Sequence, residues 1–150
     1  MKLTAYTDYT LRTLIYLALH RDRLVTIQEI AELHTISKSH LTKVVHQLGM
    51  SNMVETVRGR HGGLKLNLEP REIGIGAVVR STETDFDMAE CFDAENNSCA
   101  YAKGCNLKGV LAAATAAYLQ VLDQVTLEDL ITKPSELHVI NLYPPNSHRS

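Results

Sequence analysis

The sequence has no tryptophan and only two phenylalanines among its 150 residues, so aliphatic side chains and alanine must supply most of its core. It also lacks any run approaching the roughly 20 apolar residues that a transmembrane helix requires. Residues 1–4 contain no apolar stretch followed by a cleavage site, so we expect a cytoplasmic protein with no membrane partner. The length fits one domain, or one small domain with a dimerisation segment.

Motifs that would indicate an enzyme are missing as well. The sequence contains no GxGxxG or P-loop pattern, and no serine, histidine and aspartate in a recognisable catalytic context. Because no acid–base pair or nucleophile is set in a pocket-like context, we expect the protein not to be an enzyme.

Charge is distributed unevenly, although the net charge is only −2. Residues 1–70 carry nine Lys/Arg against six Asp/Glu, whereas residues 71–150 carry six against eleven. Between residues 37 and 65, five Lys/Arg accompany a single carboxylate, that of Glu55. Such a positive patch on a mildly acidic protein indicates one surface that meets an anionic partner. From charge alone, a solvated face with random charge placement is an equal alternative.

Hydrophobic periodicity predicts helices over residues 7–20, 26–34 and 38–49. We expect Thr7, Thr26 and Ser37 to cap them, and Thr-Ile-Gln-Glu at 26–29 matches a capping box. The third helix has an apolar stripe on one face and a polar, basic face without carboxylates on the other. A short capped helix, a tight turn and a basic helix predict a helix-turn-helix that reads the major groove of double-stranded DNA.

A basic hairpin is predicted to follow, with strands at 53–58 and 64–68. The Gly-Arg-His-Gly-Gly segment between them allows the backbone to turn and to approach a partner closely. The predicted fold class is therefore mainly α with a small β-hairpin wing, a winged helix-turn-helix followed by a long C-terminal dimerisation helix. We expect the residues of the recognition helix and the wing tip to contact DNA: Ser37, Lys38, Ser39, His40, Thr42, Lys43, Arg58, Arg60 and His61.

The rest of the chain is predicted to contain a fourth helix at 71–82, an acidic loop at 84–104 and a long helix at 105–131. Apolar residues in the long helix recur with a heptad rhythm, which predicts a homodimer interface; packing against its own domain is the alternative. The predicted organisation is thus a DNA-binding domain at 1–83, a cysteine-bearing loop at 84–104, a dimerisation helix at 105–131 and a weakly ordered tail at 132–150.

Three cysteines, Cys91, Cys99 and Cys105, lie within 15 residues. An odd number in a chain that is not exported argues against a disulfide framework. Thiolates are the soft ligands that iron–sulfur clusters and zinc need, and Cys105 begins the long helix, where backbone amides favour an anionic thiolate. The sequence has no CxxC pair, which counts against structural zinc. On this pattern an iron–sulfur cluster, zinc and three unmodified thiols all remain open.

Several stretches occur together in the order of one known family. They are LTAYTDYTLR at 3–12, ISKSHL at 36–41, VRGRHGG at 57–63 and the three-cysteine loop. Across residues 1–131 the sequence resembles the winged-helix regulators that sense nitric oxide or iron–sulfur cluster supply. The resemblance implies a homodimer with crossing C-terminal helices, an inverted-repeat operator, and an iron–sulfur cluster held by the three cysteines near the dimer interface.

Within this family the sequence is most similar to the nitric-oxide-sensing repressors. Their fourth cluster ligand is an aspartate from the partner's first helix, a position that matches Asp8; as the alternative, Asp8 is only a helix N-terminal charge. Cluster-supply sensors instead use a histidine shortly after the third cysteine, whereas Asn106, Leu107 and Lys108 follow Cys105. The resemblance thus implies one [4Fe–4S] cluster per subunit, with [2Fe–2S] as the alternative, and operator release when nitric oxide modifies it, which would control nitrosative-stress genes.

Arg12 lies one helical turn beyond Asp8. It forms either a simple local ion pair or a link that couples the cluster to the DNA-binding helices. Two other functions stay open: a redox or cluster-supply sensor of the same fold, and a metal-binding interaction protein without DNA binding. Salt-dependent, sequence-selective DNA binding would exclude the second.

Overall fold

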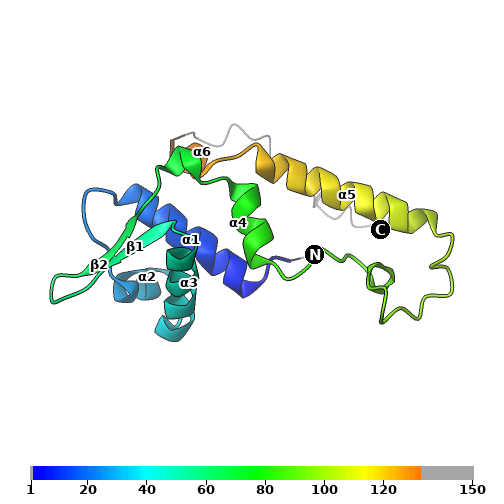
Figure 1. The fold of residues 1–150 in the computed structure, drawn as a ribbon, viewed down its shortest axis with the longest axis horizontal. Helices are drawn as coiled ribbons and strands as arrows, with labels where there is room; N and C mark the ends of the chain where they lie inside the picture. The colour runs from blue at the N-terminus through cyan, green and yellow to red at the C-terminus, as the bar shows by residue number, and fades with distance from the viewer. Residues whose placement is uncertain (1, 133–150) are drawn as a thin grey trace, which may run out of the picture.

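The computed structural model describes residues 2–132. Figure 1 shows α1 to α4 and a two-stranded hairpin gathered into one body, with α5 extending away from it. In chain order the elements are α1 (Ala5–Leu19), α2 (Ile27–His34), α3 (Lys38–Met50), β1 (Val54–Val57), β2 (Gly63–Leu66), α4 (Ile75–Thr82), α5 (Asn106–Asp123) and α6 (Leu127–Thr132). Within this part of the chain, no helix is both long and apolar enough to cross a membrane.

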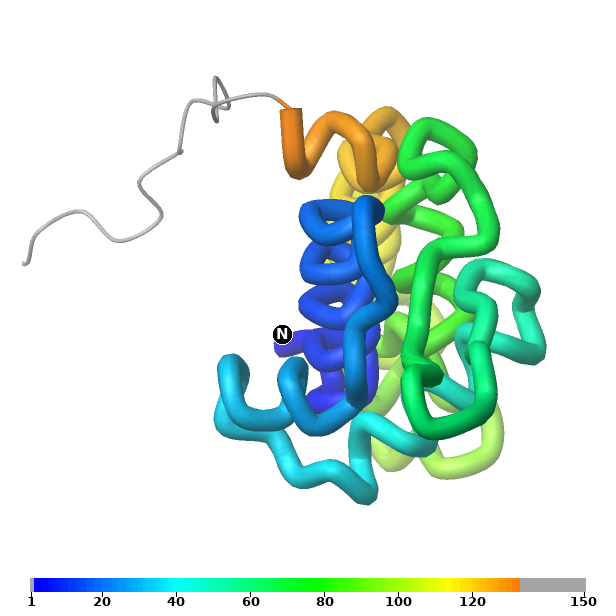
Figure 2. Tube along the Cα trace, turned by 90° about the vertical axis from the view of Figure 1, so that its left-hand side faces the viewer, coloured from blue at the N-terminus to red at the C-terminus, as the bar shows by residue number. Residues whose placement is uncertain are grey.

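Helix α1 is the central element of the body, with α6 on one side of it and α2 and α3 on the other (Figures 1 and 2). It begins at Ala5 because Thr4 is its N-cap, whose Oγ1 accepts a hydrogen bond from the Thr7 amide at 3.2 Å. The prediction that Thr7 is the cap was therefore wrong. Thr7 is instead buried in the first turn, where its hydroxyl donates to Thr82 Oγ1 of α4 at 2.9 Å.

The predicted caps of α2 and α3 are confirmed. Thr26 Oγ1 accepts from the Glu29 amide at 3.1 Å, and Ser37 Oγ accepts from the His40 amide at 3.3 Å. Helix α2 ends at His34, and the left-handed φ of 54° at its C-cap, Thr35, turns the chain toward α3. The apolar stripe predicted for α3 is buried, at Leu41, Val44, Val45 and Leu48. The caps thus define where the two helices begin, and the buried stripe of α3 faces the core.

The hairpin is antiparallel, with Val54 opposite Leu66 and Val57 opposite Gly63. It is joined to the chain before α2, because Val25 and Leu64 exchange two backbone hydrogen bonds of 3.0 and 2.7 Å. Val54, Leu64 and Leu66 bury their side chains in the core. The hairpin is thus held against the helix-turn-helix at its base, and its tip, residues 58–62, is free to project.

The segment predicted as one helix over 71–82 is a 3-10 turn, Pro70–Glu72, followed by α4. The helix predicted over 105–131 is also two helices. Helix α5 ends at Asp123, and the Val125 carbonyl accepts from the Ile75 amide at 2.9 Å, which turns the chain back onto the body. Leu127, at the start of α6, is fully buried. Apart from Thr132, the predicted tail lies outside the described residues.

The C-terminal end of helix α5 packs against α4 of the body. A Cβ atom added to Gly76 of α4 would lie 2.9 Å from the Asp123 amide nitrogen, so only glycine allows this approach. Arg80 Nη2 also pairs with Asp123 Oδ2 at 2.7 Å. No residue of α5 is buried in the single chain, so most of this helix is left without a packing partner.

Candidate DNA-binding surface and cysteine loop

The residues predicted to contact DNA are all exposed, at the start of α3 and on the hairpin tip. Within the described chain, none of the lysines and arginines in this set forms an ion pair, so their charges are available to an anionic partner. Lys65, further along the hairpin, differs because it pairs with Glu55 at 3.2 Å. The arrangement places a cationic helix beside a cationic wing, as winged-helix contact with a major groove and the adjacent phosphates requires.

The shape of the wing tip depends on two glycines. Gly59 has a φ of 116°, which side-chain-bearing residues rarely adopt. A Cβ atom on Gly62 would lie 2.2 Å from the Val57 carbonyl oxygen. The turn therefore needs glycine at both positions to present Arg58, Arg60 and His61 to solvent.

A ring contact connects α1 directly to the recognition helix. The rings of Tyr9 and His40 lie 6.0 Å apart between centroids. Tyr9 follows Asp8 in the first turns of α1, and His40 is one of the predicted DNA-contacting residues. Sequence reasoning missed this pair, because a contact between residues 31 positions apart leaves no local pattern.

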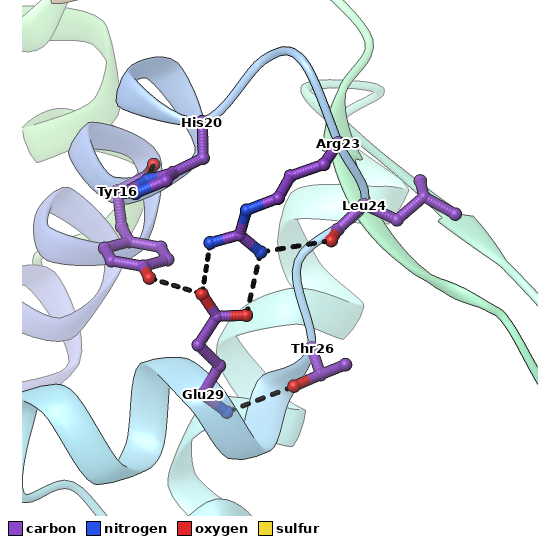
Figure 3. A network of polar contacts seen from close by, with 6 residues as sticks. All are labelled: Tyr16, His20, Arg23, Leu24, Thr26 and Glu29. Atoms are coloured by element: carbon purple, nitrogen blue, oxygen red, sulfur yellow. Dashed lines mark hydrogen bonds and ion pairs between the residues drawn. The ribbon is translucent and has the colours of Figure 1, made fainter.

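A polar network, also unforeseen from the sequence, joins the end of α1 to the start of α2 (Figure 3). The Glu29 carboxylate accepts from the Tyr16 hydroxyl at 2.5 Å and from both terminal nitrogens of Arg23. The Arg23 guanidinium, and next the Tyr16 hydroxyl, lower the pKa of Glu29 to about 2. The same hydrogen bond raises the pKa of Tyr16, whose ring stacks on His20 at 4.2 Å. This network links the last turns of α1 to the first turn of α2 through Tyr16, Arg23 and Glu29.

Replacing Glu29 with glutamine removes its ion pair with Arg23 and is expected to lower the melting temperature at pH 7. The decrease should be only a few degrees, because this pair is partly exposed and screened by solvent. The depressed pKa means that the carboxylate stabilises the fold fully above its ordinary pKa of about 4.5. The wild-type advantage should shrink as pH falls from there toward 2. Thermal unfolding of both proteins across this range measures it; a pH-independent difference would contradict the assignment.

The three cysteines are free thiols around the start of α5. Cys91 lies in a 3-10 turn, Glu90–Phe92, and is 8% exposed, whereas Cys99 and Cys105 are half-buried. Cys105 is the N-cap residue of α5, as expected from the sequence. Lys108 Nζ donates to the Cys91 carbonyl at 2.6 Å, which holds the Cys91 turn against the first turn of that helix.

Asp8 lies elsewhere, on the first turn of α1. Its carboxylate pairs with Arg12, with Nη2–Oδ2 at 2.9 Å and Nε–Oδ1 at 3.0 Å, and both side chains are more than 40% exposed. The local ion pair, one of the two alternatives for Arg12, is therefore present in the single chain. An exposed carboxylate on this surface remains accessible to a second subunit.

Among residues 2–132, no three His, Cys, Asp or Glu side chains are gathered into a metal-binding group. The single chain thus brings the cysteines to one end of α5 without closing them around a common centre, and it does not add Asp8 to them. The chemistry of the donors nevertheless fits an iron–sulfur cluster: three free thiols on one short segment, one of them at a helix N-terminus.

Known proteins share much of this sequence and its fold. Residues 3–133 match the Rrf2 family, described as iron-dependent transcriptional regulators. The chain is 52% identical to the HTH-type transcriptional regulator NsrR of Bacillus subtilis over 138 residues, covering 91% of this chain and 94% of that protein. It is 48% identical to the NsrR of Shouchella clausii over 141 residues, covering 93% and 95%.

Two solved structures share this fold. The IscR of T. potens superposes with a TM-score of 0.68 at 27% identity, covering 87% of this chain and 86% of that one. CymR, the global cysteine regulator of B. subtilis, gives 0.69 at 29% identity, covering 87% and 96%.

The fold and the exposed basic surface define a winged-helix, DNA-binding regulator. The chain belongs to the Rrf2 family of transcriptional regulators. The predicted fold class is confirmed by the helical body, the two-stranded hairpin and the C-terminal helix, which these neighbours share. Because the named relatives are regulators, the prediction that the chain is not an enzyme is confirmed as well.

Proposed function

We propose that this protein is an iron–sulfur-dependent repressor that binds an inverted-repeat operator as a homodimer. In this proposal, modification of the cluster by nitric oxide releases the operator. The nitrosative-stress genes that the protein represses are then expressed. One observation carries this proposal: three free thiols lie at the N-terminal end of an uncovered helix, in a chain about half identical to regulators named NsrR. Its site of action is the cytoplasm, where the operator lies.

Helix α5 is the proposed dimer interface. Leu107, Val110 and Val121 on this helix are 61%, 64% and 57% exposed, a large apolar area for one helix to leave in water. Figure 1 shows the helix leaving the body, with its outer sides turned away from the other helices. A second copy is the occupant we propose, with the two α5 helices crossing. Two recognition helices would then face successive major grooves of a palindromic operator.

The proposed cluster ligands are Cys91, Cys99, Cys105 and the partner subunit's Asp8. A [4Fe–4S] cluster, one per subunit, is favoured, with [2Fe–2S] as the alternative. When bound, such a cluster would supply iron able to bind nitric oxide. Of the four proposed ligands, the Asp8 carboxylate would be the most weakly held, because oxygen is a weaker ligand than thiolate for a soft metal site.

The chain's own residues then offer a short route from the ligand to DNA. A displaced Asp8 carboxylate has Arg12 as its partner, in the pairing seen in the single chain. Tyr9, the next residue, contacts His40 at the start of α3. A shift of the first turns of α1 therefore reaches a DNA-contacting side chain through one ring contact.

Replacing Arg12 with alanine is expected to leave operator binding by the cluster-loaded protein intact and to impair its release by nitric oxide. The reason is that the displaced carboxylate no longer has an alternative partner. Operator-bound fraction against added nitric oxide, measured anaerobically, reports the change. Arg21→Ala, which removes an arginine paired with Glu69 at 2.7 Å, is the matched control. Unchanged coupling in Arg12→Ala would refute this role.

The proposed function is tested by purifying the protein anaerobically and recording its absorbance spectrum with iron and sulfide counts. We expect a visible cluster band with about four irons per subunit, bleached by nitric oxide. About two irons would indicate the smaller cluster. A colourless protein that takes up no iron after reconstitution would leave a winged-helix DNA binder whose cysteines serve another purpose, with zinc tested next.

A further inference from the structure

Lys108 stands in the first turn of α5, three residues after Cys105. Its ammonium donates to the Cys91 carbonyl at 2.6 Å and lies 5.4 Å from the centroid of the Phe92 ring. The side chain is half-buried. It therefore spans from the start of the helix to the other end of the cysteine segment, 17 residues back.

This placement is unfavourable for the helix itself. The N-terminal turn of a helix carries a partial positive charge, so a lysine there is disfavoured by the helix dipole. Nor is the ammonium balanced by a carboxylate, since Lys108 forms no ion pair within the described chain. Two acidic side chains of the loop have other partners: Glu90 accepts from Ser98, and Asp93 from Asn96. The contacts with Cys91 and Phe92 therefore offset the unfavourable position of Lys108 in the helix.

This interaction closes the 15-residue segment from Cys91 to Cys105. Bringing the ends of a free loop together costs conformational entropy. A charged donor on a carbonyl is a strong hydrogen bond, and the Phe92 ring adds a cation–π contact. The ends are thus held near each other by the polypeptide alone, with no metal required.

We propose that Lys108 is a positioning residue that fastens Cys91 to the first turn of α5 in the cluster-free chain, so that the thiols are organised before iron arrives. This inference rests on the proposed cluster site and adds how that site is kept ready. Preorganised ligands bind a metal faster and more tightly, because less conformational entropy is lost on binding.

The test uses the full chain without its cluster, reduced, and treated with iodoacetamide. Mass spectrometry then gives the alkylation rate of each cysteine. A buried thiol reacts when its surroundings open, so Cys91 should be the slowest of the three in the wild type. Lys108→Met keeps an apolar stem against Phe92 and removes the donor. We expect it to accelerate Cys91 by at least about tenfold, the lower end of the range for removing a hydrogen bond to a charged group, with little change at Cys99.

Two further variants separate positioning from general loosening. Lys108→Arg keeps a cationic donor and is expected to restore most of the protection of Cys91. Lys103→Met removes an exposed lysine of the same loop and should behave as wild type. An unchanged Cys91 rate in Lys108→Met, or equal acceleration in Lys103→Met, overturns the proposal.

Cluster assembly gives a second readout. On anaerobic reconstitution with iron(II) and sulfide, Lys108→Met should gain its visible absorbance several-fold more slowly than the wild type. If neither protein takes up iron while Lys108→Met still exposes Cys91, the cluster proposal fails and the role of Lys108 in the cluster-free chain stands. If both bind iron at equal rates and Cys91 is equally protected, the role of Lys108 fails and the cluster proposal stands.

Discussion

Replacing Cys105 with serine is expected to abolish stable iron binding and, with it, specific operator binding. The hydroxyl that replaces the thiolate is a poor ligand for iron–sulfur clusters. Operator affinity should then fall toward the non-specific level, a loss of at least about 1000-fold. Iron content per subunit and fluorescence anisotropy with operator DNA measure the two effects on one preparation.

Cys105 is the best of the three cysteines for this experiment because serine suits its structural position. The residue is the N-cap of α5, and its own side chain makes no capping hydrogen bond. Serine is among the favoured N-cap residues, so the helix should form at least as well. Thermal unfolding should match that of Ser98→Ala, a control in the same loop. A variant with normal iron content and normal operator affinity would show that Cys105 is not a ligand.

Replacing both Lys43 and Arg60 with alanine is expected to weaken operator binding by roughly 100-fold or more. Lys43 lies on the exposed face of α3 and Arg60 on the wing tip, so the pair samples both parts of the DNA-binding surface. Removing a base-reading side chain from the recognition helix costs about 1–3 kcal/mol of binding free energy. Removing a phosphate-binding side chain from the wing lowers the slope of log affinity against log salt concentration by about one. Affinity measured at several salt concentrations separates the two contributions.

Arg71→Ala is the matched control for this surface. Arg71 is exposed in the 3-10 turn that packs against α6, on the side of α1 opposite α2 and α3. The substitution removes one positive charge without touching the residues predicted to bind DNA, so operator affinity should stay near that of the wild type. An equal loss of affinity per charge removed in the two proteins would mean that net charge alone governs binding.

The helix-turn-helix could be predicted from the sequence because its signals are local. Thr26 and Ser37 cap helices through amides three residues away, and the stripe of α3 repeats within four turns. The predicted start of α1 is wrong because Thr7 also makes a distant contact: it is buried and bonds Thr82 of α4, while Thr4 is the cap.

The break after α5 shows the same limit. Val125 continues the heptad rhythm, so the local pattern predicts an unbroken helix. Its carbonyl is instead bound by the Ile75 amide, and the Leu127 amide binds the Ile73 carbonyl at 2.8 Å. This pairing with a segment 50 residues earlier commits α6 to the body, which no short-range pattern reveals.

For the site, residue types could be predicted from the sequence, but their connections could not. The close spacing of the cysteines indicated a metal or cluster site, and the basic stretches indicated the residues predicted to bind DNA. The contacts of Lys108 with Cys91, Tyr9 with His40, and Glu29 with Tyr16 join segments distant in sequence. The ligand role of Asp8 stays a prediction, because it involves a second subunit. At the level of the family, the resemblance seen in the sequence agrees with the comparisons.

The central claim, that an iron–sulfur cluster controls operator binding, is tested most directly by titrating nitric oxide into the anaerobic protein–operator complex. Absorbance of the cluster and anisotropy of labelled operator DNA would be recorded on the same sample. We predict that the visible band bleaches and the operator is released over the same nitric oxide additions, and that cluster-free protein binds only non-specifically. An operator that stays bound after the band has gone, or that cluster-free protein binds equally well, would contradict the account.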